Sequence, residues 1–444
     1  METIFLITGA IIAIVVGTAK LKIHPFLSLF IVALLVGLFA GFGATDTLQF
    51  ISAGFGNTLS SIGIIIVFGT LIGVFLERTN SVEVIVNQLL KLSGGKGTSL
   101  VMNITGFIIS IPVFCDSAFI ILSSINKTLS NRTLIPMGIL SVALATGLYA
   151  AHVFVPPTPG PLAATSIIGA DLGQVLIYGL LIGLTVSLMG FLSARYILLG
   201  SNARNNIPRI KKQNEKLDIR KNSLVVFLPI AIPIVLIALK SIVNYPSYPL
   251  GQGFFFVLFD SIGSPIIALF MGVILAFLLT IPKYNSKQFS WTVDALKDAG
   301  LIILITGAGG AFGNVLKQLD IADLIALDSG SPIGGLVLIF LVAAVLKTSQ
   351  GSSTVAIITT AALIAPLLEN FQLQDSMGKT FAVLAVGSGA MTVSHLNDSY
   401  FWVVSQFSSI SARDALKSYT IATLLQGIVG IGSVVLFYFL FHNF

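Results

Sequence analysis

The chain has 444 residues, of which 55% are hydrophobic and only 9% are charged, and this composition excludes an ordinary soluble domain. It predicts an all-α, polytopic membrane protein. A single cysteine excludes an intrachain disulfide. The net charge of +6 does not indicate a nucleic-acid partner, because the basic residues lie in loops between apolar runs, which is the orientation bias of membrane proteins.

About ten apolar runs, each of roughly 17 to 27 residues, are long enough to cross the lipid bilayer as helices. Two further runs, Ser99–Asn126 and Ile333–Leu368, carry polar interruptions and are predicted to be re-entrant hairpins. The predicted spans are Thr3–Ala19, Pro25–Phe42, Leu59–Leu76, Leu134–Ala170 (interrupted), Gly173–Ala194, Leu224–Val243, Phe254–Ile281, Ala299–Leu316, Thr380–Val404 (interrupted) and Tyr419–Leu440.

The first hairpin run has Pro112, Asp116 and Ser117 in the middle of apolar sequence. Proline breaks a helix, and broken backbone at membrane depth is tolerated only where it is buried in protein or lines water. A carboxylate at that depth costs roughly 2.5–3.5 kcal/mol on insertion scales, so it should face a cavity or a partner. We therefore predict a hairpin tip at Ile111–Phe119. A kinked spanning helix whose second half is capped by Asp116 is the alternative.

Basic residues on both sides of this run help to choose between the two alternatives. Lys91 and Lys96 precede the run, and Lys127 and Arg132 follow it. The long polar segment Arg195–Lys221 is rich in basic residues and is predicted to be cytoplasmic. If this segment is cytoplasmic and the run Ser99–Asn126 spans the membrane, one of the two basic clusters must lie outside the cell. If the run re-enters on the same side, both basic clusters lie inside. The charges favour the hairpin and place both chain termini outside.

A second interruption, Ala151–Pro161, contains four prolines and one glycine between apolar flanks. Continuous helix is impossible there. Because the surroundings are apolar, we expect a break near the middle of the membrane that carries His152 and Thr158. A plain external loop is the alternative.

Two polar segments interrupt the apolar sequence of the second half of the chain, Lys347–Thr354 and Thr392–Ser399. The first is predicted to be the tip of the second hairpin. Ser352, Ser353 and Thr354 would open the second leg of the hairpin as a half-helix, whose free N–H groups and dipole favour an anion. A simple Gly-Ser turn is the alternative, but Lys347 inside an apolar run argues against it.

The two halves show the same order of elements: a glycine-rich span, a broken hairpin and a broken span. When Gly63–Val67 is aligned with Gly300–Leu304, the same register carries Gly73 onto Gly310 and Asp116 onto Ser353. The predicted orientation makes these repeats inverted, and inverted repeats with interrupted helices are typical of secondary transporters. The predicted organisation is a first repeat over residues 1–200, a cytoplasmic linker over 201–222 and a second repeat over 223–444.

The four interruptions together offer half-helix N-termini, hydroxyls, one buried cation and several titratable groups. This set suits a small, hydroxylated, anionic substrate and coupling to protons. No cofactor and no metal site are expected, and no GxxxxGK[ST] motif indicates ATP-driven transport. The candidate substrate-binding residues are Asp116, Ser117, His152, Thr158, Lys347, Ser352, Ser353, Thr354, Asn397 and Asp398, and the candidate proton-coupling residues are Asp116, His152, His395 and Asp398.

At these motifs the sequence resembles the gluconate permease (gluconate:proton symporter) family of the ion-transporter superfamily. The stretches that carry the resemblance span both halves of the chain and are Ile111–Phe119, His152–Ala164, Ile305–Phe312, Gln350–Ala356 and Ser394–Trp402. The resemblance implies proton-driven uptake of gluconate or a related small hydroxy- or amino-acid anion across the bacterial plasma membrane. It also implies a homodimer with moving hairpins that bear the substrate.

One position departs from the family pattern. Gluconate carriers of this family commonly have a histidine between the prolines, where this chain has Thr158. The departure leaves the family assignment intact and keeps glycerate, D-serine or another sugar acid open as the substrate.

Two other classes of protein deserve comparison. An intramembrane hydrolase could use a serine and a histidine, but nothing marks one serine as a nucleophile, and no HExxH motif is present. A passive channel would also use re-entrant loops, but it does not need titratable groups at their tips. Proton-driven accumulation in liposomes separates a transporter from both.

Overall fold

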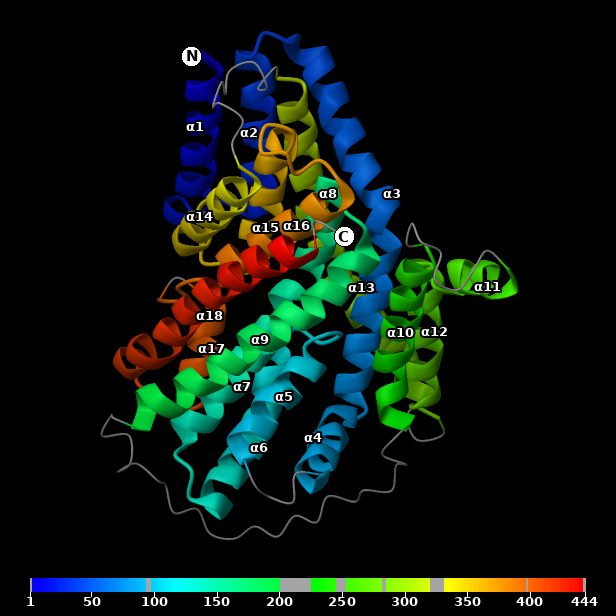
Figure 1. Ribbon diagram of the computed structural model, residues 1–444, viewed down its shortest axis with the longest axis vertical. Helices are drawn as coiled ribbons and strands as arrows, with labels where there is room; N and C mark the ends of the chain where they lie inside the picture. The colour runs from blue at the N-terminus through cyan, green and yellow to red at the C-terminus, as the bar shows by residue number, and fades with distance from the viewer. Residues whose placement is uncertain are drawn as a thin grey trace.

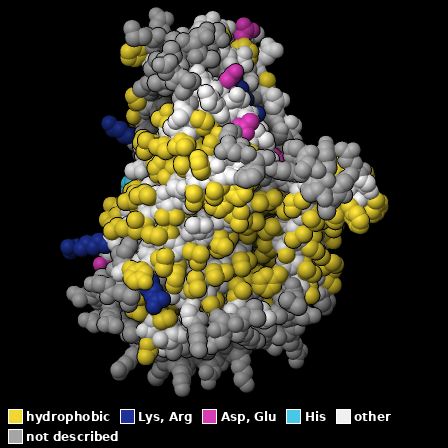
Figure 2. Space-filling model, in the orientation of Figure 1, with side chains coloured by type: hydrophobic (Ala, Val, Ile, Leu, Met, Phe, Trp, Pro, Cys, Tyr) yellow, Lys and Arg dark blue, Asp and Glu magenta, His cyan; other side chains and the backbone are white. Residues whose placement is uncertain are grey.

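Helices are the only regular structure in the described part of the chain (Figure 1), so the all-α prediction is confirmed. The computed structural model describes residues 2–92, 97–199, 225–244, 253–281, 285–319, 331–396 and 398–441. On the face drawn in Figure 2, hydrophobic side chains cover a broad band across the middle of the molecule, while acidic side chains appear near its upper end. Such a band is what contact with lipid requires.

Both predicted hairpins are present. The first consists of α5 (Thr98–Ile109) and α6 (Cys115–Thr133), and the second of α14 (Pro332–Gln350) and α15 (Ser353–Ile364), which ends in the short turn η5 (Ala365–Leu367). Figure 1 shows the first hairpin in the lower half of the molecule and the second in the upper half. This placement agrees with the expected inverted arrangement.

Both predicted interrupted helices are also present. The helix α7 (Met137–Phe154) stops before a short extended segment, and α8 (Pro159–Ile168) follows it. The helix α16 (Ser376–Ala390) is likewise separated from α17 (Ser399–Phe407) by residues 391–398. Proline at the first position of α8 explains its start, because proline has no N–H to donate and its fixed φ suits the first helical turn.

The long helices α3 (Gly43–Arg78) and α13 (Gln288–Lys317) pack closely and run in opposite directions. A Cβ atom on Gly54 would lie 2.6 Å from the carbonyl oxygen of Gly310, and the Asn314 amide donates to the Phe50 carbonyl at 2.8 Å. Residues later in α3 thus contact residues earlier in α13, as expected for an antiparallel pair. Only glycine at the crossing lets the two backbones come this near.

The sequence underestimated the length of α3, which was expected only over Leu59–Leu76. The polar residues before that range do not end the helix, because their hydroxyls bond back to helix carbonyls. Thr47 donates to the Gly43 carbonyl at 2.6 Å, and Thr58 donates to the Gly54 carbonyl at 2.9 Å.

The expected span Phe254–Ile281 is not one straight helix. It is divided into α11 (Phe254–Ile262) and α12 (Pro265–Leu278), which bend by 67° relative to each other. Pro265 at the start of α12 explains the break, since its ring clashes with the backbone of a continuing helix. Figure 1 shows α11 projecting sideways from the molecule.

The remaining elements complete the two halves. They are α1 (Glu2–Val15), the π-helix η1 (Val16–Lys20), α2 (Pro25–Phe39), α4 (Ser81–Leu92), α9 (Leu172–Leu199), η3 (Val225–Phe227), α10 (Leu228–Val243), η4 (Asn285–Lys287) and α18 (Ala412–Phe441).

The number of spans, about ten, stays a prediction. Among the described residues, seven helical segments are long and apolar enough to cross a membrane, or eight if the bent pair α11–α12 counts as one span. The helices α1 and α2 have 14 and 15 residues, and a membrane-spanning helix needs about 20. The boundaries of the two repeats also stay a prediction, and most of the linker, residues 201–222, lies outside the described residues.

Cysteine labelling tests the predicted orientation. Cys115 is buried and is the only cysteine of the chain, so Cys115→Ser gives a cysteine-free background. A membrane-impermeant reagent added to intact cells should label a cysteine placed at Asn443 and leave one at Asn202 unlabelled. Both positions lie outside the described residues, and labelling at Asn202 would reject the topology.

Candidate functional site

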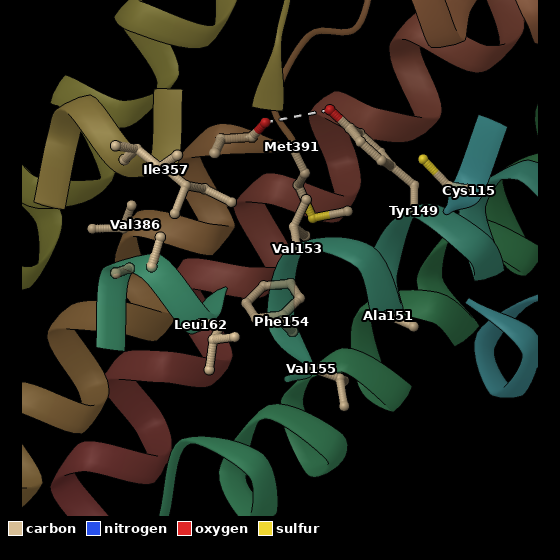
Figure 3. Packing of buried hydrophobic residues seen from close by; sticks show 14 of the residues in the cluster. Cys115, Tyr149, Ala151, Val153, Phe154, Val155, Leu162, Ile357, Val386 and Met391 are labelled. Carbon is tan, nitrogen blue, oxygen red and sulfur yellow. Dashed lines mark hydrogen bonds between the residues drawn. The ribbon is translucent and has the colours of Figure 1, made fainter. Parts of the chain in front are cut away.

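The helix α7 forms the centre of the protein, and every residue from Ile139 to Phe154 in it is buried. Figure 3 shows Val153, Phe154 and Val155 packed among side chains of neighbouring helices where α7 ends. A helix that is buried on all sides lies in the core of the protein. The break that follows it is therefore held deep inside the protein and is not the external loop considered above.

A hollow lies between this break and the tip of the first hairpin. It is lined by Pro112 and Phe114 from the hairpin and by Pro157 and Thr158 from the break, together with residues of α3 and α13. The tip reaches α3 closely, because a Cβ atom on Gly73 would lie 2.4 Å from the Pro112 carbonyl oxygen. Thr158 lines this hollow, and its hydroxyl donates to the Val155 carbonyl at 2.5 Å.

The four half-helices α6, α8, α15 and α17 start close to one another. In the first turn of α8, a Cβ atom on Gly160 would lie 2.7 Å from Ile357 of α15. Phe119 of α6 and Tyr400 of α17 stack edge to face with ring centres 6.1 Å apart. The N-cap residues of α6 and α8, Phe114 and Thr158, line the same hollow, which links the two pairs. The four N-terminal ends therefore lie in the interior, where free N–H groups and the helix dipole favour an anion.

Asp116 is the second residue of α6 and lies in this interior. The N-cap of α6 is Phe114, so Asp116 does not occupy the capping position that the alternative reading required. Its Oδ1 atom is buried and has no hydrogen-bond partner. Phe119 of the same helix contacts Tyr400, whose ring centre lies 5.5 Å from that of Tyr149. The Tyr149 ring centre lies 6.0 Å from Nζ of Lys347, so the first hairpin tip lies near the second. Ser117 is the next residue of α6, and its side chain is outside the described atoms.

His152 lies in the last turn of α7 and is only 6% exposed. Its Nδ1 atom is buried without a hydrogen-bond partner. His152 follows Tyr149 by three positions on α7, and the Tyr149 ring centre lies 6.0 Å from Nζ of Lys347, the ion-pair partner of Asp398. The structure therefore brings three candidates from different interruptions, Asp116, His152 and Asp398, to one site.

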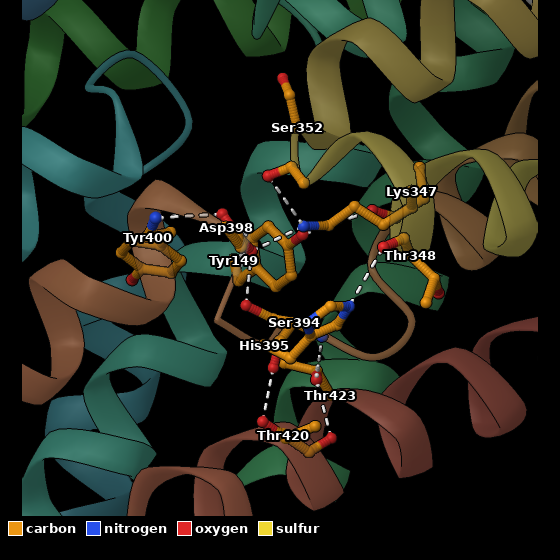
Figure 4. Close-up of polar contacts among 12 residues, drawn as sticks. Tyr149, Lys347, Thr348, Ser352, Ser394, His395, Asp398, Tyr400, Thr420 and Thr423 are labelled. Carbon is orange, nitrogen blue, oxygen red and sulfur yellow. Dashed lines mark hydrogen bonds and ion pairs between the residues drawn. The ribbon is translucent and has the colours of Figure 1, made fainter. Parts of the chain in front are cut away.

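A buried ion pair joins the second hairpin to the α16–α17 break (Figure 4). The Nζ atom of Lys347 lies 2.6 Å from Oδ2 of Asp398, and the two side chains are 1% and 5% exposed. Ser394 donates to the same carboxylate oxygen, and the backbone N–H of Tyr400 donates to Oδ1 at 3.0 Å. Asp398 is thus an ion-pair partner and the N-cap of α17 at once.

The same break is held from two further sides. Nε2 of His395 lies 3.1 Å from the carbonyl oxygen of Thr348 in the second hairpin. Thr420 donates to the Ser394 carbonyl at 2.5 Å, and the Ser394 N–H donates to the Thr423 hydroxyl at 3.0 Å. These contacts, which Figure 4 displays, bind the break to α18 as well as to α14.

The tip of the second hairpin begins α15 with the predicted hydroxyl residues. Ser352 is its N-cap and accepts from the N–H of Val355 at 3.4 Å. Ser353 and Thr354 form the first turn, with Ser353 only 8% exposed. Asn397, the remaining candidate, lies outside the described residues.

Sequence reasoning missed two members of the site. Tyr149 lies on α7 with its ring centre 6.0 Å from Nζ of Lys347, and Ser394 contacts Asp398. A signal for Tyr149 was available, because it precedes His152 by three positions and so shares a helix face with it. Ser394 belonged to the fourth interruption but had no feature that distinguished it from its neighbours.

Comparison with protein families matches residues 1–440 to the GntP family permease. A gluconate permease from Pseudomonas aeruginosa is 31% identical over 436 residues, which cover 96% of this chain and 95% of that protein. The D-serine transporter DsdX from Escherichia coli strain K12 is 31% identical over 97% of both chains. The inner membrane permease YgbN of the same strain is 32% identical over 97% of this chain and 98% of its own length.

Among solved structures, the crystal structure of the YdaH transporter from Alcanivorax borkumensis superposes with a TM-score of 0.67. The match covers 94% of this chain and 99% of that one at 14% identity. At this identity the likeness concerns the fold, and it extends across both halves of the chain.

Proposed function

Because the chain belongs to the GntP family of permeases and is a multi-pass membrane transporter, we propose that it takes up gluconate or a related small hydroxy-acid anion together with protons. The family and its named relatives are permeases and transporters, so the chain is not an enzyme. The resemblance to the gluconate permease family that the motifs indicated is thereby confirmed.

The convergence of the four half-helix N-termini is the observation that carries this proposal. N–H groups at such ends bind carboxylates without a charged side chain. The Ser352, Ser353 and Thr354 hydroxyls at the start of α15, with Thr158 before α8, offer hydrogen bonds to a hydroxylated substrate. The names of the relatives agree with this chemistry, since gluconate, L-idonate and D-serine all carry a carboxylate and a hydroxyl.

Lys347 is proposed to act on the substrate through its charge. Its Nζ atom already contacts Asp398 and the Gly351 carbonyl, so direct contact with a substrate would require one of these bonds to open. Asn397 and Ser117 stay in the proposed substrate-binding set, because Asn397 belongs to the break before α17 and Ser117 follows Asp116 at the first hairpin tip.

Asp116 is proposed as the main proton carrier, with His152 next. The polar atoms Oδ1 of Asp116 and Nδ1 of His152 are buried without partners, so both side chains can change protonation without breaking an existing bond at these atoms. The other two candidates are engaged, Asp398 with Lys347 and His395 with the Thr348 carbonyl. Breaking those contacts would add to the cost of each proton transferred.

Uptake by purified protein in liposomes tests the proposal. An inward proton gradient should concentrate labelled gluconate inside, and dissipation of the gradient should abolish the concentration. Equilibration without accumulation would indicate a passive channel and reject proton coupling.

A competition panel identifies the substrate. Unlabelled gluconate, L-idonate, glycerate and D-serine should be added in excess to the uptake assay. The second candidate is D-serine, because a D-serine transporter matches this chain as well as the gluconate permease does. In addition, Thr158 at the hollow stands where gluconate carriers of the family commonly have a histidine. Stronger competition by D-serine than by any sugar acid would replace the hydroxy-acid assignment.

Ser353→Ala is expected to raise the apparent KM for uptake roughly two- to tenfold, because one lost neutral hydrogen bond is worth about 0.5–1.5 kcal/mol. The maximal rate should change little. Ser331→Ala is a matched control, since Ser331 caps the end of α14 opposite the hairpin tip. Unchanged uptake kinetics in well-expressed Ser353→Ala protein would remove Ser353 from the binding site.

A further inference from the structure

The ammonium group of Lys347 is surrounded by the groups that proteins use to hold a small cation. The carboxylate of Asp398 lies 2.6 Å from Nζ and the carbonyl oxygen of Gly351 lies 3.3 Å from it. The ring centre of Tyr149 lies 6.0 Å from Nζ, within the range of cation–π attraction. Only 1% of the Lys347 side chain is exposed, so these three partners take the place of water around its ammonium group.

The backbone at the end of α14 is shaped around this ammonium. Gly351 is the C-cap of α14 and has φ of 77°, a left-handed conformation that glycine adopts without strain. Its N–H caps the carbonyl of Lys347 at 2.9 Å, while its own carbonyl contacts Nζ of the same lysine. The negative end of the helix dipole adds to the attraction for a cation at this place.

This position lies where two interruptions meet. Gly351 belongs to the second hairpin tip, and Asp398 comes from the α16–α17 break. In transporters with discontinuous helices, unwound carbonyls and half-helix C-terminal ends are the groups that coordinate metal cations. Here a side chain of the protein itself supplies the positive charge.

We propose that Lys347 is a tethered cation, whose ammonium permanently occupies a monovalent-cation site made by Asp398, Gly351 and Tyr149. The wild-type protein then needs no sodium or potassium ion at this place. Removal of the lysine side chain leaves a site for a small monovalent cation. This inference does not depend on which anion is carried or on which residue carries the proton.

Thermal unfolding of the purified full-length protein tests the inference. Lys347→Ala should unfold at a lower temperature than wild type in choline chloride, whose cation is too large for the site. Added methylammonium or sodium chloride, at constant ionic strength, should raise that temperature saturably. In liposomes, the same cations should restore part of the uptake that Lys347→Ala has lost.

Two variants serve as controls. Lys347→Met fills the space without a charge, so no cation should stabilise it beyond the choline reference. Lys240→Ala breaks a similar pair, in which Nζ lies 2.5 Å from Asp260, but those side chains are 33% and 41% exposed. Since water already solvates that carboxylate, this variant should not distinguish the salts.

Three results would overturn the inference. The first is a folded Lys347→Ala protein that no small cation stabilises more than choline does. The second is a wild-type protein that sodium or methylammonium stabilises in the same saturable way. The third is a Lys347→Ala protein that stays unfolded in every salt. This result counts against the inference regardless of whether the double variant Lys347→Ala/Asp398→Asn, which removes both charges, folds.

Discussion

Asp116→Asn is expected to retain exchange of internal for external substrate but to lose accumulation driven by a pH gradient. The asparagine keeps the shape of the side chain and imitates a permanently protonated carboxyl group. A buried carboxylate whose Oδ1 atom lacks a partner carries an uncompensated cost, and a proton removes it. Protonation also removes a negative charge from a site that must accept an anion, so proton and substrate should bind together.

Counterflow and gradient-driven uptake in the same liposomes separate these two activities. Counterflow should remain near the wild-type rate in Asp116→Asn, whereas the internal substrate concentration should rise no higher than the external one. Asp375→Asn is a matched control, because Asp375 caps the exposed start of α16 through the N–H groups of Met377 and Gly378, and asparagine caps equally well. If Asp116→Asn still concentrates substrate, the proton is carried elsewhere, and His152 is next.

Asp398→Ala is expected to lower the free energy of unfolding by about 3–5 kcal/mol, which is the usual cost of leaving one member of a buried ion pair without its partner. The ammonium of Lys347 would keep only the Gly351 carbonyl and the Tyr149 ring. The α17 N-cap would be lost as well. The variant should show a strongly reduced yield of folded protein and a lower unfolding temperature.

Two comparisons isolate the charge from the cap. Asp398→Asn keeps a side chain that caps a helix, so the destabilisation that it shares with Asp398→Ala belongs to the lost charge. Asp260→Ala breaks the partly exposed Lys240 pair and should cost only about 0–1 kcal/mol. An effect of Asp398→Ala as small as that of Asp260→Ala would show that the buried pair is not a main support of the site.

Much of the fold could be predicted because each interruption is a local property of the chain. Pro112 and the prolines from Pro156 to Pro161 prevent a continuous helix from running through their segments. Polar residues inside apolar runs, such as those of Lys347–Thr354, must find partners or water within the protein. The breaks in both hairpins and in both interrupted helices therefore fall within a few residues of the predicted interruptions.

The partners inside the site depended on the tertiary structure. Lys347 and Asp398 are 51 positions apart and were predicted separately as substrate ligands, yet they bond to each other. Tyr149 belongs to the first half of the chain but faces an ammonium of the second half. No periodicity or composition relates such residues, because the pairing follows from which half-helices meet in space.

The chain by itself determined where the helices break, since proline geometry and the cost of polar groups in lipid act on a few neighbouring residues. Only the tertiary structure decided which charges are compensated and which are not. Asp398 is paired because α14 brings Lys347 to the break before α17. Asp116, which the sequence marks just as strongly, keeps a carboxylate oxygen without a partner, because none of the described groups around the start of α6 donates to it.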